Sequence, residues 1–204
     1  MKAQPEAYGR TRWRRFAALF GAGAAVAAAI TLGMSNGALA ASFMVSGQQF
    51  KVSADSLEGT GFVNYGWIDQ HADGSAEPVA VSGIRQATLR NMCQSVVTTL
   101  PIVGDITLRL SAGTGSTPVT ATDLLIDMEQ LEGDADFTNI EIGRDASTLD
   151  AGPSGAQGLQ GLFGQQSDRV VITDLRQVAW AANAGRFRLN GLRMSVVPGK
   201  SECF

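Results

Sequence analysis

Hydrophobic and polar residues alternate at every second position in several stretches of the chain. Apolar side chains occupy alternate positions in 50–54, 106–110 and 187–189, with polar side chains between most of them. This period of two is typical of strands that bury one face and expose the other. Further β-rich stretches are 77–100, 118–128, 135–142 and 169–180, and glycine- or proline-rich breaks lie at 113–118 and 151–164. These breaks have the composition of turns and loops between strands.

The pattern after Ala41 predicts an all-β fold. No stretch there combines the spacing of an amphipathic helix with helix-capping residues. We expect a single β-rich domain at 41–204, built as a mostly antiparallel curled sheet or sandwich. Two similar triplets, 45–47 and 81–83, leave a short β-solenoid as the alternative, although no regular repeat is established.

The alternation changes phase at Asn190-Gly191, a dipeptide typical of two-residue hairpins. A tight hairpin would place Arg188 opposite Arg193, which is an unfavourable like-charge pair. A β-bulge within one continuous strand changes the phase without that clash. We therefore favour the bulge and keep the hairpin as the alternative.

The first forty residues have the composition of an export signal. Four arginines between positions 10 and 15 precede an uncharged, alanine-rich run at 16–41, which contains the small-residue pattern Ala38-Leu39-Ala40. We expect a signal peptide at 1–40, cleaved before Ala41, and the alternative is a retained membrane anchor at the same place. Either way, 41–204 is predicted to be extracytoplasmic, secreted or associated with the cell envelope.

Charge and composition exclude some classes of function. The 204 residues carry a net charge of −3, and residues 41–204 alone carry 11 basic and 18 acidic side chains, or −7. This balance argues against nucleic-acid binding. Cys93 and Cys203 both lie in the part predicted to be exported, where disulfides form. We expect them to form one internal disulfide, with free thiols or an intermolecular bond as alternatives.

Ser56 is a weak candidate nucleophile. Ala54-Asp55-Ser56-Leu57 differs by one residue from the Gly-Asp-Ser-Leu block of a lipase and esterase family. Serine needs a base, but the sole histidine, His71, does not have the spacing found in that family, and Lys51 is not placed near any serine. We interpret Ser56 as a structural serine and His71 as a surface-loop residue, which leaves no recognisable catalytic set.

Opposite charges gather in different parts of the chain. Residues 105–150 have a net charge of −8, whereas 169–204 have +4. The two segments could attract each other within the domain or between copies of the chain. Calcium is an alternative partner for the acidic segment, but no recognised loop spacing is present. We expect a solvated strand face there, and no metal or cofactor.

Glycine recurs at every third position from 152 to 164, and Leu159, Leu162 and Phe163 lie in the same stretch. Three large apolar side chains are unusual for a solvent loop. One hypothesis is an apolar contact loop that touches lipid or a partner. We favour the alternative, in which the three side chains fold back onto the sheet of their own domain.

Several segments resemble an uncharacterised family of exported actinobacterial proteins. They are Gly37-Ala38-Leu39-Ala40-Ala41-Ser42-Phe43, the stretch 45–54, Cys93-Gln94-Ser95-Val96 and Glu202-Cys203-Phe204. Members are often labelled cholesterol esterases, and their genes are thought often to neighbour one for a small multi-span membrane protein. The resemblance therefore implies export and names that membrane protein as a partner. It carries over no catalytic residue.

These observations favour a non-enzymatic, exported cell-envelope protein that binds a lipid, an envelope component or a membrane-protein partner. One alternative is a secreted sterol or lipid esterase that uses Ser56 with an unusual base. The other is a self-assembling surface protein, in which the acidic and basic segments of neighbouring copies attract each other.

Overall fold

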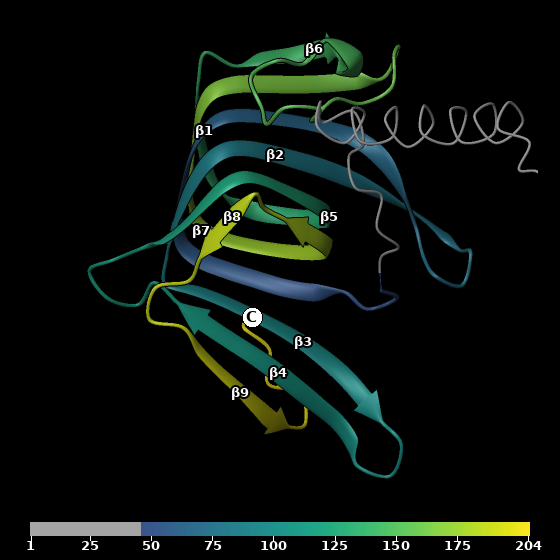
Figure 1. The fold of residues 1–204 in the computed structure, drawn as a ribbon, viewed down its shortest axis with the longest axis vertical. Coiled ribbons are helices and arrows are strands. Elements are labelled where there is room, and N and C mark those ends of the chain that lie inside the picture. The colour runs from purple at the N-terminus through teal and green to yellow at the C-terminus, as the bar shows by residue number, and fades with distance from the viewer. Residues whose placement is uncertain (1–45) are drawn as a thin grey trace, which may run out of the picture. The chain divides into compact units, whose positions relative to one another are not determined.

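A computed structural model describes residues 46–204, and the expected signal peptide lies outside them. The described part is one antiparallel sheet of nine strands with a single 3₁₀ turn, which confirms the predicted curled all-β sheet (Figure 1). The strands are β1 (Phe50–Gln70), β2 (Ala76–Arg90), β3 (Met92–Leu100), β4 (Gly104–Ala112), β5 (Val119–Thr138), β6 (Glu141–Asp145), β7 (Phe163–Asn183), β8 (Arg186–Arg188) and β9 (Arg193–Pro198). The 3₁₀ turn η1 is Ala146–Thr148.

Four long strands close into a ring. β1 pairs with β2, β2 with β5, β5 with β7, and β7 again with β1. Such closure requires bent strands, and β5 bends where its register against β7 shifts, including at Glu132/Asp134. Gly133 lies in that shift with a φ of +150°, and an added Cβ would lie 2.7 Å from Ile172 Cγ2. Only glycine fits this bend.

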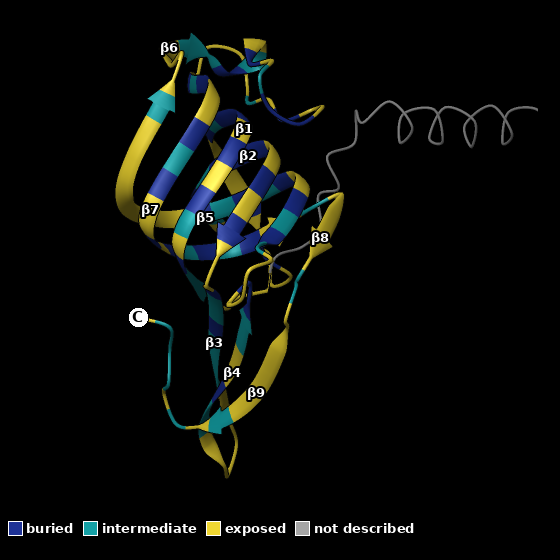
Figure 2. Ribbon diagram, turned by 90° about the vertical axis from the view of Figure 1, so that its left-hand side faces the viewer, coloured by how far each residue is buried: buried dark blue, intermediate teal, exposed yellow. Residues whose placement is uncertain are grey.

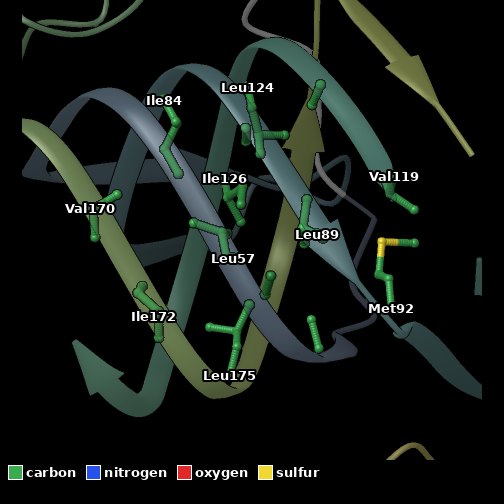
Figure 3. Close-up of a cluster of buried hydrophobic side chains, with 14 of the residues drawn as sticks. Leu57, Ile84, Leu89, Met92, Val119, Leu124, Ile126, Val170, Ile172 and Leu175 are labelled. Carbon is green, nitrogen blue, oxygen red and sulfur yellow. The ribbon is translucent and has the colours of Figure 1, made fainter. Parts of the chain in front are cut away.

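The interior of the ring is the main hydrophobic core. Alternate residues of the four strands point inward, so their side chains meet in one cluster (Figure 3). Leu57 from β1, Val170 and Leu175 from β7, and Val119 from β5 are at most 2% exposed. Aliphatic side chains therefore line the interior of the ring, and they would form the wall of any site that opens into it.

A second, smaller core covers the opposite face of the same strands. η1 and the loop after it bring Ala146, Leu149 and Ala156 onto Val63 and Tyr65. Arg85 fixes this loop by donating hydrogen bonds to the carbonyl oxygens at 150, 151 and 152. The glycine-rich stretch is thus a docked cover over the sheet.

Strands β3, β4 and β9 form a three-stranded extension of the sheet, which we call the arm (Figures 1 and 2). It joins the ring where β3 pairs with the start of β1. The C-terminal tail, residues 199–204, lies across one face of the arm. Cys93 in β3 and Cys203 in the tail form the disulfide that the sequence predicted.

Both sequence interpretations of Asn190-Gly191 are wrong. β8 pairs with β5, whereas β9 pairs with β4, so the two strands neither form a hairpin nor continue as one bulged strand. The dipeptide instead makes a turn in which Gly191 has a φ of +68°. The turn carries the chain from the ring to the arm and avoids the Arg188–Arg193 pairing.

Candidate apolar binding site

An apolar cavity of about 310 Å³ lies where the interior of the ring meets the arm. Eleven of the fourteen lining residues are apolar, three carry amides and none is charged. They are Phe50, Val52, Leu57, Leu89, Met92, Gln94, Leu124, Ile126, Leu175, Gln177, Ala182, Asn183, Ala184 and Phe187. Several of them, including Leu57, Leu175 and Met92, belong to the cluster drawn in Figure 3. The cavity is therefore an extension of the ring interior.

Strand register links the cavity lining to one face of the arm. Gln177 in β7 lies opposite Val52 in β1, and Val52 lies opposite Gln94 in β3. The same row continues across the arm through Leu110 in β4 to Met194 in β9. Side chains that lie opposite each other share a face of the sheet. The cavity wall and this arm face are thus one continuous surface.

That face of the arm, which we call the apolar arm face, is open to solvent. A second row along it joins Val96, Leu108 and Val196. Met194 and Val196 are 61% and 62% exposed, and Leu108 is 38% exposed. Phe187, which lines the cavity, is 43% exposed. A bound apolar chain could therefore pass from the cavity onto the arm without meeting a charged lining residue.

The amides are the polar groups of the cavity. Gln177 is only 2% exposed although it is polar, and Gln94, which lies beyond Val52 in the same row, is half-buried. Amides can both donate and accept hydrogen bonds. The lining therefore suits a molecule that is mostly apolar and carries one uncharged or weakly polar group.

The structure places the sequence-predicted contact residues away from this cavity. Leu159, Leu162 and Phe163 are 58%, 45% and 59% exposed, next to β6 at the start of β7. They do not line the cavity, and they are not among the side chains that pack the loop onto the sheet. They form a separate exposed apolar group.

Ser56 and His71 are not brought together. Ser56 is half-buried within β1, opposite Arg90 and Thr173, whereas His71 follows the last residue of that strand. Lys51 is engaged with the tail, where its ammonium lies 3.2 Å from a carboxylate oxygen of Glu202. The interpretation of His71 as a surface residue is wrong, because it is 7% exposed and its ring packs edge-on against Trp180 at 5.1 Å.

His71 belongs to a buried polar cluster that the sequence analysis missed. Its other members are Tyr65, Asp69, Asp127 and Trp180. Within residues 46–204, Asp69 Oδ2, His71 Nδ1 and Trp180 Nε1 have no hydrogen-bond partner. Burial, reinforced by the Asp69 carboxylate, raises the pKa of Asp127 to about 6. Burial, reinforced by Asp127, raises the pKa of Tyr65 to about 12. The spacing of Tyr65, Asp69 and His71 on one strand face was the available signal.

The acidic segment does not converge on a metal site. Among residues 46–204, no group of three or more histidine, cysteine, aspartate or glutamate side chains is placed to hold a metal ion. Within the same part of the chain, no helix has both the length and the apolar character needed to cross a membrane.

The family model of DUF6230, described as a family of unknown function, matches residues 46–204. The chain belongs to this family. No curated protein and no solved structure matches it. The match spans the ring, the arm and the tail, so both the cavity and the apolar arm face lie within the part that defines a DUF6230 member.

Proposed function

We propose that this DUF6230 protein is an exported, non-enzymatic protein of the actinobacterial cell envelope that binds an acyl chain in its apolar cavity. The observation that carries the proposal is the continuity of an uncharged, mostly aliphatic cavity with the exposed apolar arm face. Burying an acyl chain there would remove apolar surface of both ligand and protein from water. Each buried methylene contributes about 0.8 kcal/mol.

The size of the cavity favours a single chain. Small-molecule sites usually have volumes of roughly 300–1,000 Å³, so a cavity of about 310 Å³ is at the small end of that range. A complete two-chain lipid or a sterol ester needs more room than this. The remainder of such a ligand would lie along the apolar arm face, where Leu108 and Val196 are exposed.

The lining also favours an uncharged ligand segment. A carboxylate inside the cavity would have no cationic side chain among its lining residues to offset the loss of hydration. The amides of Gln94 and Gln177 can instead hydrogen-bond an ester or amide group near the mouth. We therefore expect neutral chains, or chains whose charged head stays outside, to bind best.

Native mass spectrometry of the exported protein tests this proposal. We expect the protein to carry a co-purifying lipid or to take up added methyl palmitate. Ala182→Trp should lose this lipid binding. Ala182 lies opposite Ile126 and lines the cavity, so an indole at this position would fill it. Ala72→Trp is the matched control, because Ala72 is an exposed residue of the β1–β2 turn. Equal lipid uptake by both variants would contradict the proposal.

Ester hydrolysis on the same samples tests the esterase alternative. A binding protein should retain the ester without cleaving it, and Ser56→Ala should change nothing. Hydrolysis that disappears in Ser56→Ala would replace the proposal with an enzymatic one.

A further inference from the structure

We infer that the arm is a membrane-docking element that inserts its tip and lays its apolar face on an anionic lipid bilayer. The tip is the β3–β4 connection with its flanking residue, 100–103. This inference extends the proposed function, because it names the surface from which the acyl chain would reach the cavity.

The first argument is that the polar face of the arm is buried whereas its apolar face is exposed to solvent. The face opposite the apolar one carries Ser95 and Thr107, and both are fully buried beneath the tail. Thr107 donates a hydrogen bond to the carbonyl of Gly199 and accepts one from the amide of Ser201. The amide of Cys203 donates to Ser95 Oγ, and the disulfide fixes the tail there. The tail thus covers the polar face and leaves the apolar face open.

The second argument is the tip itself. Ile102 is fully exposed with a φ of +75°, and its neighbour Val103 is 69% exposed. Ile102 follows Pro101, at a turn position that normally takes glycine or asparagine because they tolerate positive φ. A β-branched residue is strained there. The chain therefore keeps a large, exposed apolar side chain at a position where it lowers the stability of the fold.

The third argument is charge. The arm with its tail, residues 92–112 and 193–204, carries three basic side chains and two acidic ones, or +1, and Arg186 and Arg188 in the neighbouring β8 raise the charge of this end of the domain to +3. The remaining described residues, 46–91 and 113–185, carry −10. An anionic lipid surface attracts the basic part and repels the acidic part, which would turn the arm toward the membrane.

The fourth argument is the continuity between the tip and the cavity. The apolar arm face runs from the row of Ile106 and Pro198, next to the tip, to the row of Leu110 and Gln94, next to the cavity. An acyl chain that leaves a bilayer at the tip could stay in apolar contact along this path. The exposed group around Leu159 has no such link to the cavity.

Co-sedimentation with vesicles tests the inference. The protein is collected from the exported fraction of an expressing bacterium and mixed with phosphatidylcholine vesicles, with or without phosphatidylglycerol. We expect binding that increases with phosphatidylglycerol and falls with salt. Ile102→Asn/Val103→Asn should weaken it by about tenfold or more, because two inserted apolar side chains are lost. Asparagine tolerates positive φ, so this variant should fold at least as well as the original chain.

Leu159→Ser/Leu162→Ser is the matched control, since it removes two exposed apolar side chains elsewhere. It should bind vesicles as the unmodified protein does. Docking by the arm is overturned if the tip variant binds normally, if the control variant loses binding, or if the unmodified protein binds neither vesicle. A dimer in solution that the tip variant disrupts would assign the surface to a second copy and also overturn it.

Lipid uptake separates this inference from the proposed function. Ala182→Trp should lose lipid uptake but keep vesicle binding, whereas the tip variant in detergent-solubilised lipid should keep uptake. If Ala182→Trp retains uptake and the tip variant loses only vesicle binding, docking stands and the cavity proposal fails.

Discussion

Removal of the disulfide should reveal how strongly the tail is tied to the arm. Cys93 and Cys203 are 110 residues apart in sequence, so their bond closes a loop that contains most of the described chain. On the chain-entropy treatment, a loop of this length restricts the unfolded chain by about 5 kcal/mol of free energy. We expect Cys93→Ala/Cys203→Ala to lower the free energy of unfolding by roughly 3–5 kcal/mol, since native disulfides often contribute somewhat less than this treatment gives.

The contacts of the tail should partly survive without the bond. Three hydrogen bonds join it to Ser95 and Thr107, and each contributes about 0.5–1.5 kcal/mol. At its end, the Phe204 ring lies 5.1 Å from the ammonium of Lys51. The native fold should therefore persist in the variant, while amides of β3 and β4 exchange hydrogen faster as the tail detaches.

Equilibrium denaturation in urea measures the first effect, and native-state hydrogen exchange measures the second. The reduced original chain should match the double variant in both. A loss of stability below about 1 kcal/mol would refute the loop-closure reasoning. Unchanged exchange in β3 and β4 would refute the claim that the disulfide holds the tail on the arm.

Three further changes test other parts of the structure. Asp127→Asn should raise the free energy of unfolding by roughly 1–2 kcal/mol at pH 8 and leave it nearly unchanged at pH 4. Burial raises the pKa of Asp127 to about 6, so the carboxyl destabilises the fold increasingly as the pH rises from the pKa of the unfolded chain, about 4, to 6, and by a constant amount above that. A constant difference across denaturation curves from pH 4 to 8 would contradict this. Gly152→Ala should lower thermal stability, by about 1–3 kcal/mol, because the added Cβ would lie 2.5 Å from a valine methyl carbon. Gly66→Ala, where nothing lies within 4 Å, is its control, and equal melting temperatures for the two variants would show that the loop is not docked. Ile102→Asn alone should stabilise the chain by about 1 kcal/mol in chemical denaturation, and a destabilised variant would mean that positive φ is not strained there.

Periodicity identified the strands because alternation is a local property. It also indicated which side chains point inward, such as Val52 and Ala54. Ring closure was not predictable in the same way, since β1 pairs with β7 across more than a hundred residues and nothing in either strand specifies the other. The cavity exists only because the ring closes and β3 extends from it.

Local irregularities of the backbone account for the other features that the sequence analysis did not predict. Asn91 has a φ of +50° and separates β2 from β3 within 77–100, which the sequence analysis gave as a single β-rich stretch. Trp180 lies at a register shift between β5 and β7. The shift places its indole against His71, on the face of the sheet that carries the second core. Bulges of this kind depend on the partner strand, so the sequence of β7 alone does not reveal them.

The location of a bound chain tests the central claim most directly. Fatty-acid methyl ester carrying a nitroxide at the end of its chain is added to delipidated protein, and methyl resonances are followed by NMR. We expect broadening at Leu57, Leu175 and Met92 inside the ring, and sharp signals at Val63 and Leu149 in the second core. Broadening at the second core, or at the exposed group around Leu159, with sharp signals inside the ring would contradict the account.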